Sequence, residues 1–203
     1  MIMKSCWILL AGAACAFAQP VGFGLKVGVP LTDFVDAAKS GDLSYVRTTN
    51  RYIVGVQGEL RLPFGFGIEA NALYRHINYS GTVSGTSFTT TANAWEFPIL
   101  GKYRFKSKIV RPFISAGVAF DTLQGLKQSV LSGNPITYDP SSEVQNHTTK
   151  GFVAGAGLEI HVPLLHIQPE IRFTRWGAKH FGSLNGLLDS NQNQAEFLVG
   201  ITF

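Results

Sequence analysis

Cysteine is nearly absent from this sequence of 203 residues, and its two cysteines, Cys6 and Cys15, both lie in the first 18 positions. The rest of the chain therefore has no thiol nucleophile, no thiolate ligand for a metal and no disulfide framework. Charge is also scarce, since only 15% of the residues are Asp, Glu, Lys or Arg. The formal net charge of +4 is too small and too dispersed to indicate a nucleic-acid partner.

Long apolar runs are missing after the first 18 residues, which excludes a membrane-spanning helix in the rest of the chain. The first segment has Lys4, then an apolar stretch, then the small-residue pattern Ala16-Phe17-Ala18. These features predict a secretory signal peptide over residues 1–18 and a single mature domain over residues 19–203. The alternative is a lipoprotein signal in which Cys15 carries the lipid.

Glycine is abundant, with 22 residues, and aromatic residues make up 12% of the chain. Because glycine is costly inside helices, this composition favours an all-β protein. Apolar and polar residues alternate with a period of two in eight segments, which is the pattern expected of strands. The expected strands span residues 22–30, 51–62, 66–79, 93–105, 111–121, 150–162, 165–176 and 194–203.

The connections between these expected strands alternate in length. The long ones span residues 31–50, 80–92, 122–149 and 177–193, and the short ones span residues 63–65, 106–110 and 163–164. Short turns at one end and long loops at the other are typical of a membrane barrel. The sequence therefore predicts an eight-stranded antiparallel up-and-down transmembrane β-barrel with four long outer loops.

One face of the expected strands is apolar, and the other carries charge or glycine. In the last strand, Phe197, Val199 and Ile201 share one face, opposite Glu196 and Gly200. In a membrane barrel the apolar face meets lipid, and eight strands leave an interior just wide enough for side chains. We therefore expect a lumen plugged by ion pairs. The members expected in this lumen charge network are Lys26, Glu59, Arg61, Glu69, Arg75, Glu96, Lys102, Arg104, Glu159, Glu170, Arg172 and Glu196.

Aromatic residues gather near both ends of the expected strands. Two such levels indicate the girdles that form where a barrel crosses the two membrane interfaces. A soluble lipocalin-like barrel, the alternative, would have its apolar face inside and its charges outside. The aromatic residues expected at the membrane interfaces are Tyr52, Tyr74, Trp95, Tyr103, Phe105, Phe120, Phe152 and Phe203.

Three stretches of the sequence, AEFLVGITF (195–203), EFPILGKYRF (96–105) and PEIRFTRW (169–176), resemble the OmpA/OmpX-like outer-membrane β-barrel domain family. The first, which ends on Phe203, is similar to the assembly signal of bacterial outer-membrane barrels. The resemblance implies a location in the bacterial outer membrane, in contact with its lipid and lipopolysaccharide. It also implies assembly by the barrel-assembly machinery after escort by periplasmic chaperones. It implies no enzymatic activity, and we expect no cofactor.

One group of residues offers an enzymatic alternative. His180 and Ser183, with Glu196 on the last strand, are the residue types of a base, a nucleophile and an orienting carboxylate. This arrangement is similar to that of outer-membrane lipid A deacylases, an acyl hydrolase activity. In those enzymes one residue separates the His from the Ser, whereas two do here, which breaks the expected geometry. A narrow pore lined by charged rings is a further alternative.

No metal site is expected, because the five histidines form no close ligand pair on one element. His161 and His166 flank a short turn, and we expect their side chains on opposite faces.

The function that the sequence favours is not enzymatic. We expect a structural role, or a role in surface interaction and adhesion through the four outer loops, with a surface partner that the sequence does not identify.

Overall fold

The computed structural model describes residues 21–32, 35–37, 43–46, 52–83, 86–107, 109–132, 134–138, 148–162, 165–178 and 188–203. Most of these residues lie in strands. The predicted signal peptide, residues 1–18, lies outside the described residues. Within them, no helix is long and apolar enough to cross a membrane.

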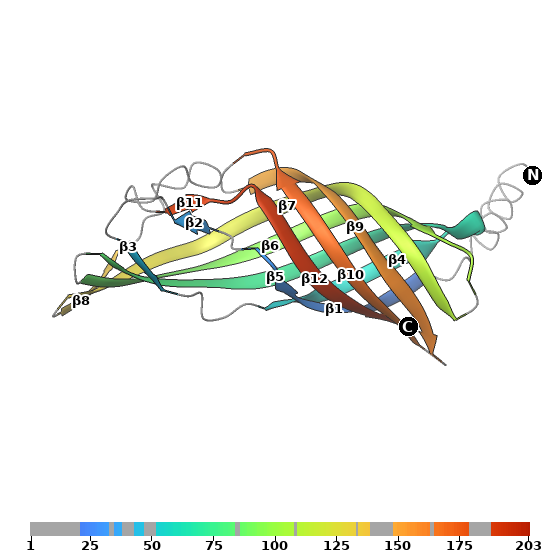
Figure 1. Ribbon diagram of the computed structural model, residues 1–203, viewed down its shortest axis with the longest axis horizontal. Coiled ribbons are helices and arrows are strands. Elements are labelled where there is room, and N and C mark those ends of the chain that lie inside the picture. Colours follow the sequence, from blue (N-terminus) through green and yellow to red (C-terminus); the bar gives the residue numbers. More distant parts are fainter. Residues whose placement is uncertain are drawn as a thin grey trace, which may run out of the picture.

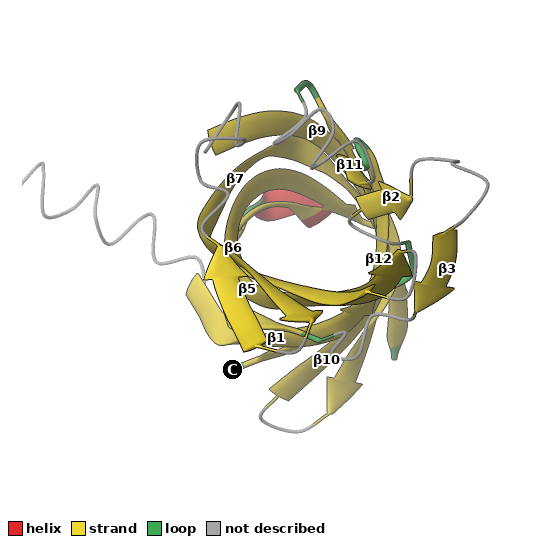
Figure 2. Cartoon of the chain, turned by 90° about the vertical axis from the view of Figure 1, so that its left-hand side faces the viewer, coloured by secondary structure: helices red, strands yellow, loops and turns green. Residues whose placement is uncertain are grey.

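Eight strands form the wall of a closed barrel (Figure 1). Each runs antiparallel to the next one along the chain, and the last pairs with the first to close the ring that Figure 2 shows end-on. The wall strands are β1 (Val21–Pro30), β4 (Ile53–Arg61), β5 (Phe66–Val83), β6 (Thr86–Arg104), β7 (Val110–Ser132), β9 (Thr148–Val162), β10 (Leu165–Trp176) and β12 (Asn193–Thr202). The predicted eight-stranded antiparallel up-and-down barrel is therefore confirmed.

The period of two in the sequence becomes the two faces of this wall. In β1, Leu25 is 57% exposed on the outside, whereas the next residue, Lys26, is completely buried on the inside. Lys26 lies opposite Gly55 of β4 and Gly200 of β12, which have no side chains to compete for the interior. Glycine on the inner face thus leaves the room that a long charged side chain needs in a narrow barrel.

Short connections and the C-terminus lie at the same end of the barrel, which we call the turn end (right in Figure 1). Between β4 and β5 the chain makes one 3-10 turn, η1 (Pro63–Gly65), as the short connection 63–65 predicted. Phe64 and Gly65 have φ angles of 65° and 89°. Glycine adopts such angles at little cost, so Gly65 suits a turn this tight.

At the opposite end, the loop end, the strands continue further than the sequence predicted. β5 and β6 stay paired as far as Val83 and Thr86, so most of the expected loop 80–92 is a hairpin. β7 likewise continues to Ser132 and pairs with β8 (Asn134–Tyr138). The period-two signal needs apolar and polar residues in alternation, and the sequence lacks this alternation over residues 80–92 and 122–132.

Three further short strands lie at the loop end (left in Figure 1). β3 (Leu43–Val46) adds to the extended part of β5, and β2 (Val35–Ala37) pairs with β11 (Leu188–Ser190). The first and last expected loops therefore contain strands that meet each other, although about 150 residues separate them in the sequence.

Candidate functional site

The interior of the barrel is polar at two levels. Seven carboxylates and five cations are buried there, and the partly buried Arg61 adds a sixth cation. Two small apolar clusters also line the interior: Ile53, Leu73 and Leu198 form one, and Leu100, Ala119, Val153 and Trp176 form the other. We call the polar group around Glu69, Glu170 and Glu59 the turn-side cluster and the group around Arg75 the loop-side cluster. The two groups adjoin where Arg172 of β10 lies opposite Glu196 of β12. All twelve residues expected in the lumen charge network point inward and belong to one of these clusters.

The centre of the turn-side cluster joins four strands through two carboxylates. Lys26 Nζ of β1 lies 2.5 Å from Glu69 Oε1 of β5 and 3.1 Å from Glu170 Oε2 of β10. Arg172 Nη2 bridges the same two carboxylates, at 3.3 Å and 3.1 Å. Lys102 of β6 also donates to Glu69. Because each cation has a carboxylate partner, burial of these charges is tolerable in a water-poor interior.

The rest of the turn-side cluster lies nearer the mouth of the barrel. Arg104 contacts Glu59 and donates from Nε to Glu159 Oε2 at 2.8 Å. Arg61 Nε donates to Glu59 Oε1 at 2.9 Å. Gln168 Nε2 lies 3.2 Å from Glu59 Oε2 and 3.0 Å from Glu159 Oε2, so this amide links the two carboxylates. These contacts continue the network from its centre to the turn-end mouth.

The two histidines that flank residues 163–164 in the sequence lie together, so the prediction that they occupy opposite faces was wrong. His161 of β9 pairs with His166 of β10, and their rings meet edge-to-face with 4.4 Å between centroids. Residues that pair across this turn have numbers of opposite parity, so an odd position on β9 and an even position on β10 share a face. Arg61 Nη2 lies 3.2 Å from His166 Nδ1.

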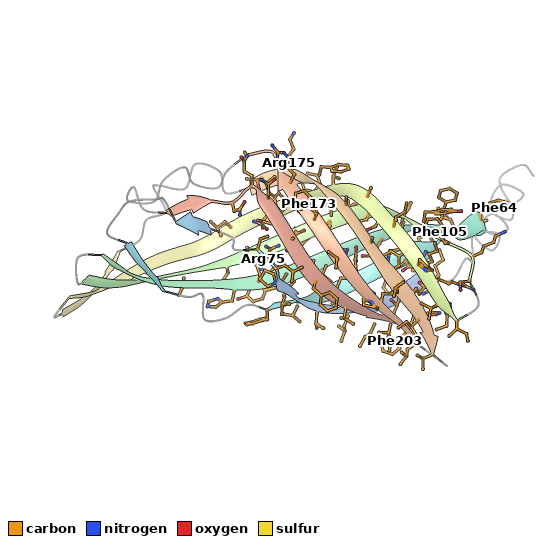
Figure 3. The ribbon with its side chains drawn as sticks, in the orientation of Figure 1. Phe64, Arg75, Phe105, Phe173, Arg175 and Phe203 are labelled. Carbon is orange, nitrogen blue, oxygen red and sulfur yellow. The ribbon has the colours of Figure 1, made fainter. Side chains whose placement is uncertain are left out.

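The loop-side cluster is centred on one cation, Arg75 of β5. Its guanidinium donates to Glu96 of β6, to Glu196 Oε1 of β12 at 2.6 Å and to Gln194 Oε1 of β12 at 2.8 Å. Figure 3 shows Arg75 inside the barrel wall. A single arginine therefore ties β5 to two strands on opposite sides of the ring, and it holds two buried carboxylates near each other.

Some buried polar residues escaped the sequence analysis. Asp121 is completely buried on the inner face of β7, although it stood at the end of an expected strand. Gln168 and Gln57 are also inside, where Gln57 Nε2 donates to Thr202 Oγ1 at 2.7 Å. Their position on the charged face of each strand was the available signal. Gln57 and Gln168 are neutral, so the charge pattern did not mark them, and Asp121 lies at the last residue of its expected strand.

The expected interface aromatics lie on the outer face of the wall. At the turn end, the Tyr103 ring lies 5.0 Å from Phe66 and 5.1 Å from Phe105 between centroids. At the loop end, Tyr74 and Trp95 are 5.3 Å apart. The remaining members, which are exposed, are Tyr52, Phe120, Phe152 and Phe203. Figure 3 labels Phe105 and Phe203 at the turn end.

The alternative catalytic group is described only in part. Glu196 is buried and is bonded to Arg75, whereas His180 and Ser183 lie outside the described residues. No group of three or more His, Cys, Asp or Glu side chains is arranged to hold a metal ion in the part of the chain that the structure describes.

Comparison with solved structures finds other barrels of this kind. OprG from Pseudomonas aeruginosa matches with a TM-score of 0.55 and 11% identity, over 90% of this chain and 92% of that chain. The N-terminal barrel domain of Pseudomonas aeruginosa OprF has a TM-score of 0.45 and 13% identity, over 91% and 98% of the two chains. Neisserial surface protein A has 0.44 and 13%, over 90% and 94%. At these identities the likeness shows the fold alone.

Comparison at the level of sequence gives the family. No curated protein matches the chain. A family model described as the outer membrane protein beta-barrel domain matches residues 17–177, which is most of the chain. The predicted resemblance to OmpA/OmpX-like barrels and the predicted location are thereby confirmed. The chain belongs to the outer membrane protein β-barrel domain family, and it is a protein of the bacterial outer membrane.

Proposed function

We propose that the protein is a plugged, non-conducting barrel with a structural role, or a role in surface interaction and adhesion, carried out by its outer connections. The observation that supports this proposal is the ion-paired interior. Cations from β1, β5, β6 and β10 meet carboxylates from β4, β5, β6, β9, β10 and β12. Such cross-links hold the strands of the wall together through the centre of the barrel.

The alternative of an open pore requires mobile water and ions where these side chains lie. The turn-side cluster occupies the interior with groups that bond to one another. An ion that passes would have to break these contacts or lose its hydration beside apolar side chains such as Leu73 and Leu198, and both are strongly unfavourable. We infer that the interior blocks conduction.

The interaction role rests on the loop end. In a membrane barrel the short turns face the periplasm and the longer connections face outward. Here the outward end carries the paired extensions of β5, β6 and β7 and the short strands β2, β3, β8 and β11. Sites on long connections held by a rigid scaffold are well suited to bind partners.

The proposed role is not enzymatic. Glu196 is the carboxylate that a catalytic triad would need, but its Oε1 accepts a hydrogen bond from Arg75 inside the wall. This contact supports a structural use of Glu196. For biogenesis we propose the barrel-assembly machinery and periplasmic chaperones as partners, on the basis of the C-terminal motif that ends at Phe203.

Planar-bilayer recording tests the plugged lumen. We expect the wild-type protein to insert without stepwise conductance. In Lys102→Ala/Arg172→Ala, two buried cations of the turn-side cluster are removed, and water should enter the space around Glu69 and Glu170. We expect this variant to show small conductance steps.

The matched control is Lys106→Gln, which removes an exposed cation at the turn end and should stay silent. Well-resolved steps from the wild-type protein would overturn the proposal. Because wild-type recordings alone decide it, failure of the double variant to fold would leave the test intact.

A further inference from the structure

Two cations lie on the outer face of the barrel, which is uncharged elsewhere among the wall-strand side chains that the structure describes. Lys150 of β9 and Arg175 of β10 point outward and are exposed. Among the outward side chains of the eight wall strands that the structure describes, they are the only Lys, Arg, Asp or Glu residues. Both lie at the loop end, and Figure 3 shows Arg175 extending away from the wall there. The outer face at the turn end has no counterpart among the described strand residues.

The register of β9 and β10 brings these two cations together. Arg175 lies directly opposite Phe152, and the Gly177 amide donates to the Lys150 carbonyl oxygen at 2.9 Å. Lys150 and Arg175 are therefore diagonal neighbours on one face, a spacing of about 7–8 Å that long side chains can span. Arg175 Nη1 also donates to Asn193 Oδ1 of β12 at 3.0 Å, on the side of β10 away from Lys150, so the two cations border the site from different strands.

An apolar groove runs beside the pair. It has a volume of about 420 Å³, and its lining includes Val118, Phe120 and Phe152 together with Lys150 and Arg175. Phe152 is 60% exposed, so this surface is open to the surroundings of the barrel. A ligand that fits the whole feature needs an apolar chain for the groove and an anionic group for the two cations.

The position of the two cations in the membrane indicates which lipid would bind there. The loop end of the barrel faces outward, so the cations lie at the level of the outer leaflet's headgroups. In the bacterial outer membrane, that leaflet carries lipopolysaccharide, whose lipid A anchor has several acyl chains and two phosphates. Lysine and arginine bind phosphate strongly, and two adjacent cations suit a lipid with more than one negative charge.

We propose that Lys150, Arg175 and the groove between Phe120 and Phe152 form a binding site for lipid A, which we call the wall site. The two side chains pair with a lipid A phosphate, and one acyl chain lies along the apolar groove. The wall site depends on the outer-membrane location and not on the plugged lumen. A failure of this proposal would therefore leave the proposed function untouched.

Native mass spectrometry tests the wall site with protein purified from outer membranes, stripped of lipid in detergent and titrated with bis-phosphorylated lipid A. In Lys150→Gln/Arg175→Gln both cations become neutral amides of similar length. We expect lipid A affinity to fall roughly thirtyfold, since each basic residue near an anionic lipid surface contributes a few-fold to tenfold in binding. The matched control, Lys106→Gln/Arg111→Gln, removes two cations at the turn end and should bind as tightly as wild type.

A second comparison needs only the wild-type protein and therefore does not depend on how the variants fold. Lipid A without phosphates should bind at least about tenfold more weakly than the bis-phosphorylated form. Equal affinity for the two lipids, or equal affinity of the two charge variants, would overturn the proposal. Equally tight binding of phosphatidylglycerol would overturn the assignment to lipid A, because the site would then be a general one for anionic lipids.

Discussion

Arg75 illustrates how much a single buried residue holds in place. Its guanidinium contacts Glu96 and Glu196 and also Gln194, and all four side chains are buried. Without Arg75, the two carboxylates would remain inside the barrel with their main cation gone. The cost of an uncompensated buried charge is larger than the net stabilisation that an intact buried ion pair provides.

We predict that Arg75→Gln lowers the free energy of unfolding by about 3–5 kcal/mol, the usual loss when one partner of a buried ion pair is removed. Urea unfolding in lipid vesicles, followed by fluorescence of Trp95 and Trp176, measures the change. Adding Glu96→Gln to this variant should recover part of the loss, because it removes one of the unpaired charges.

The exposed cation Lys106 gives the comparison, since Lys106→Gln should change the free energy of unfolding by less than about 0.5 kcal/mol. If Arg75→Gln unfolds at the same urea concentration as Lys106→Gln, the loop-side cluster does not stabilise the barrel.

At the scale of the element, the closing pair β1 and β12 depends on glycine. Gly24 lies on the inner face of β1, where a Cβ atom would overlap the carbonyl oxygen of Ile201 on β12. Gly58 on the neighbouring strand β4 faces outward, and the nearest atoms to a Cβ there belong to the Phe23 ring, 3.8 Å away. Two glycines on adjacent strands thus differ in what surrounds them.

Gly24→Ala should separate β1 from β12 and destabilise the barrel by about 1–3 kcal/mol, the typical cost of overpacking. Gly58→Ala should be neutral or slightly stabilising, because the new methyl group fits and the unfolded chain loses freedom. Gel migration of unboiled protein after heating to increasing temperatures measures both. The same midpoint for the two variants would show that β1 and β12 can shift without loss.

At the scale of the whole molecule, Phe203 distinguishes the assembly of the barrel in cells from the stability of the folded barrel. Its amide donates to the Phe23 carbonyl oxygen at 2.9 Å, whereas its side chain is 70% exposed. The ring therefore contributes little packing within the folded barrel. If it serves as the assembly signal that the C-terminal motif suggests, its effect belongs to the insertion step in cells.

We predict that Phe203→Ala refolds in detergent with the same thermal midpoint as wild type but reaches the outer membrane in much smaller amounts. The yield of heat-modifiable protein from cell envelopes, set beside the refolded yield from purified chain, separates the two effects. Phe23→Ala is the matched control, since Phe23 is 68% exposed at the same end and should leave both yields unchanged. Normal membrane levels of Phe203→Ala would contradict an assembly role.

The bounds of most wall strands could be predicted from the sequence. Seven of the eight wall strands extend no more than seven residues beyond their expected bounds, and β10 has the expected bounds of 165–176. The exception is β7. The alternation of apolar and polar residues ends near Asp121, but the strand continues to Ser132. The inward face was also predictable, because lipid outside and a narrow interior allow only one orientation of the charges.

The sequence by itself determined the class of fold, the order and direction of the strands, and which side chains face lipid. These follow from local alternation and from connection lengths, both of which are written along the chain. The tertiary structure decided which charges meet. Lys26 and Glu69 are 43 positions apart, and Gln168 reaches Glu59 across 109, because the offset between strands at closure sets every contact across the interior. The register between the consecutive strands β9 and β10 placed His161 against His166 and Lys150 diagonal to Arg175 on the outer face.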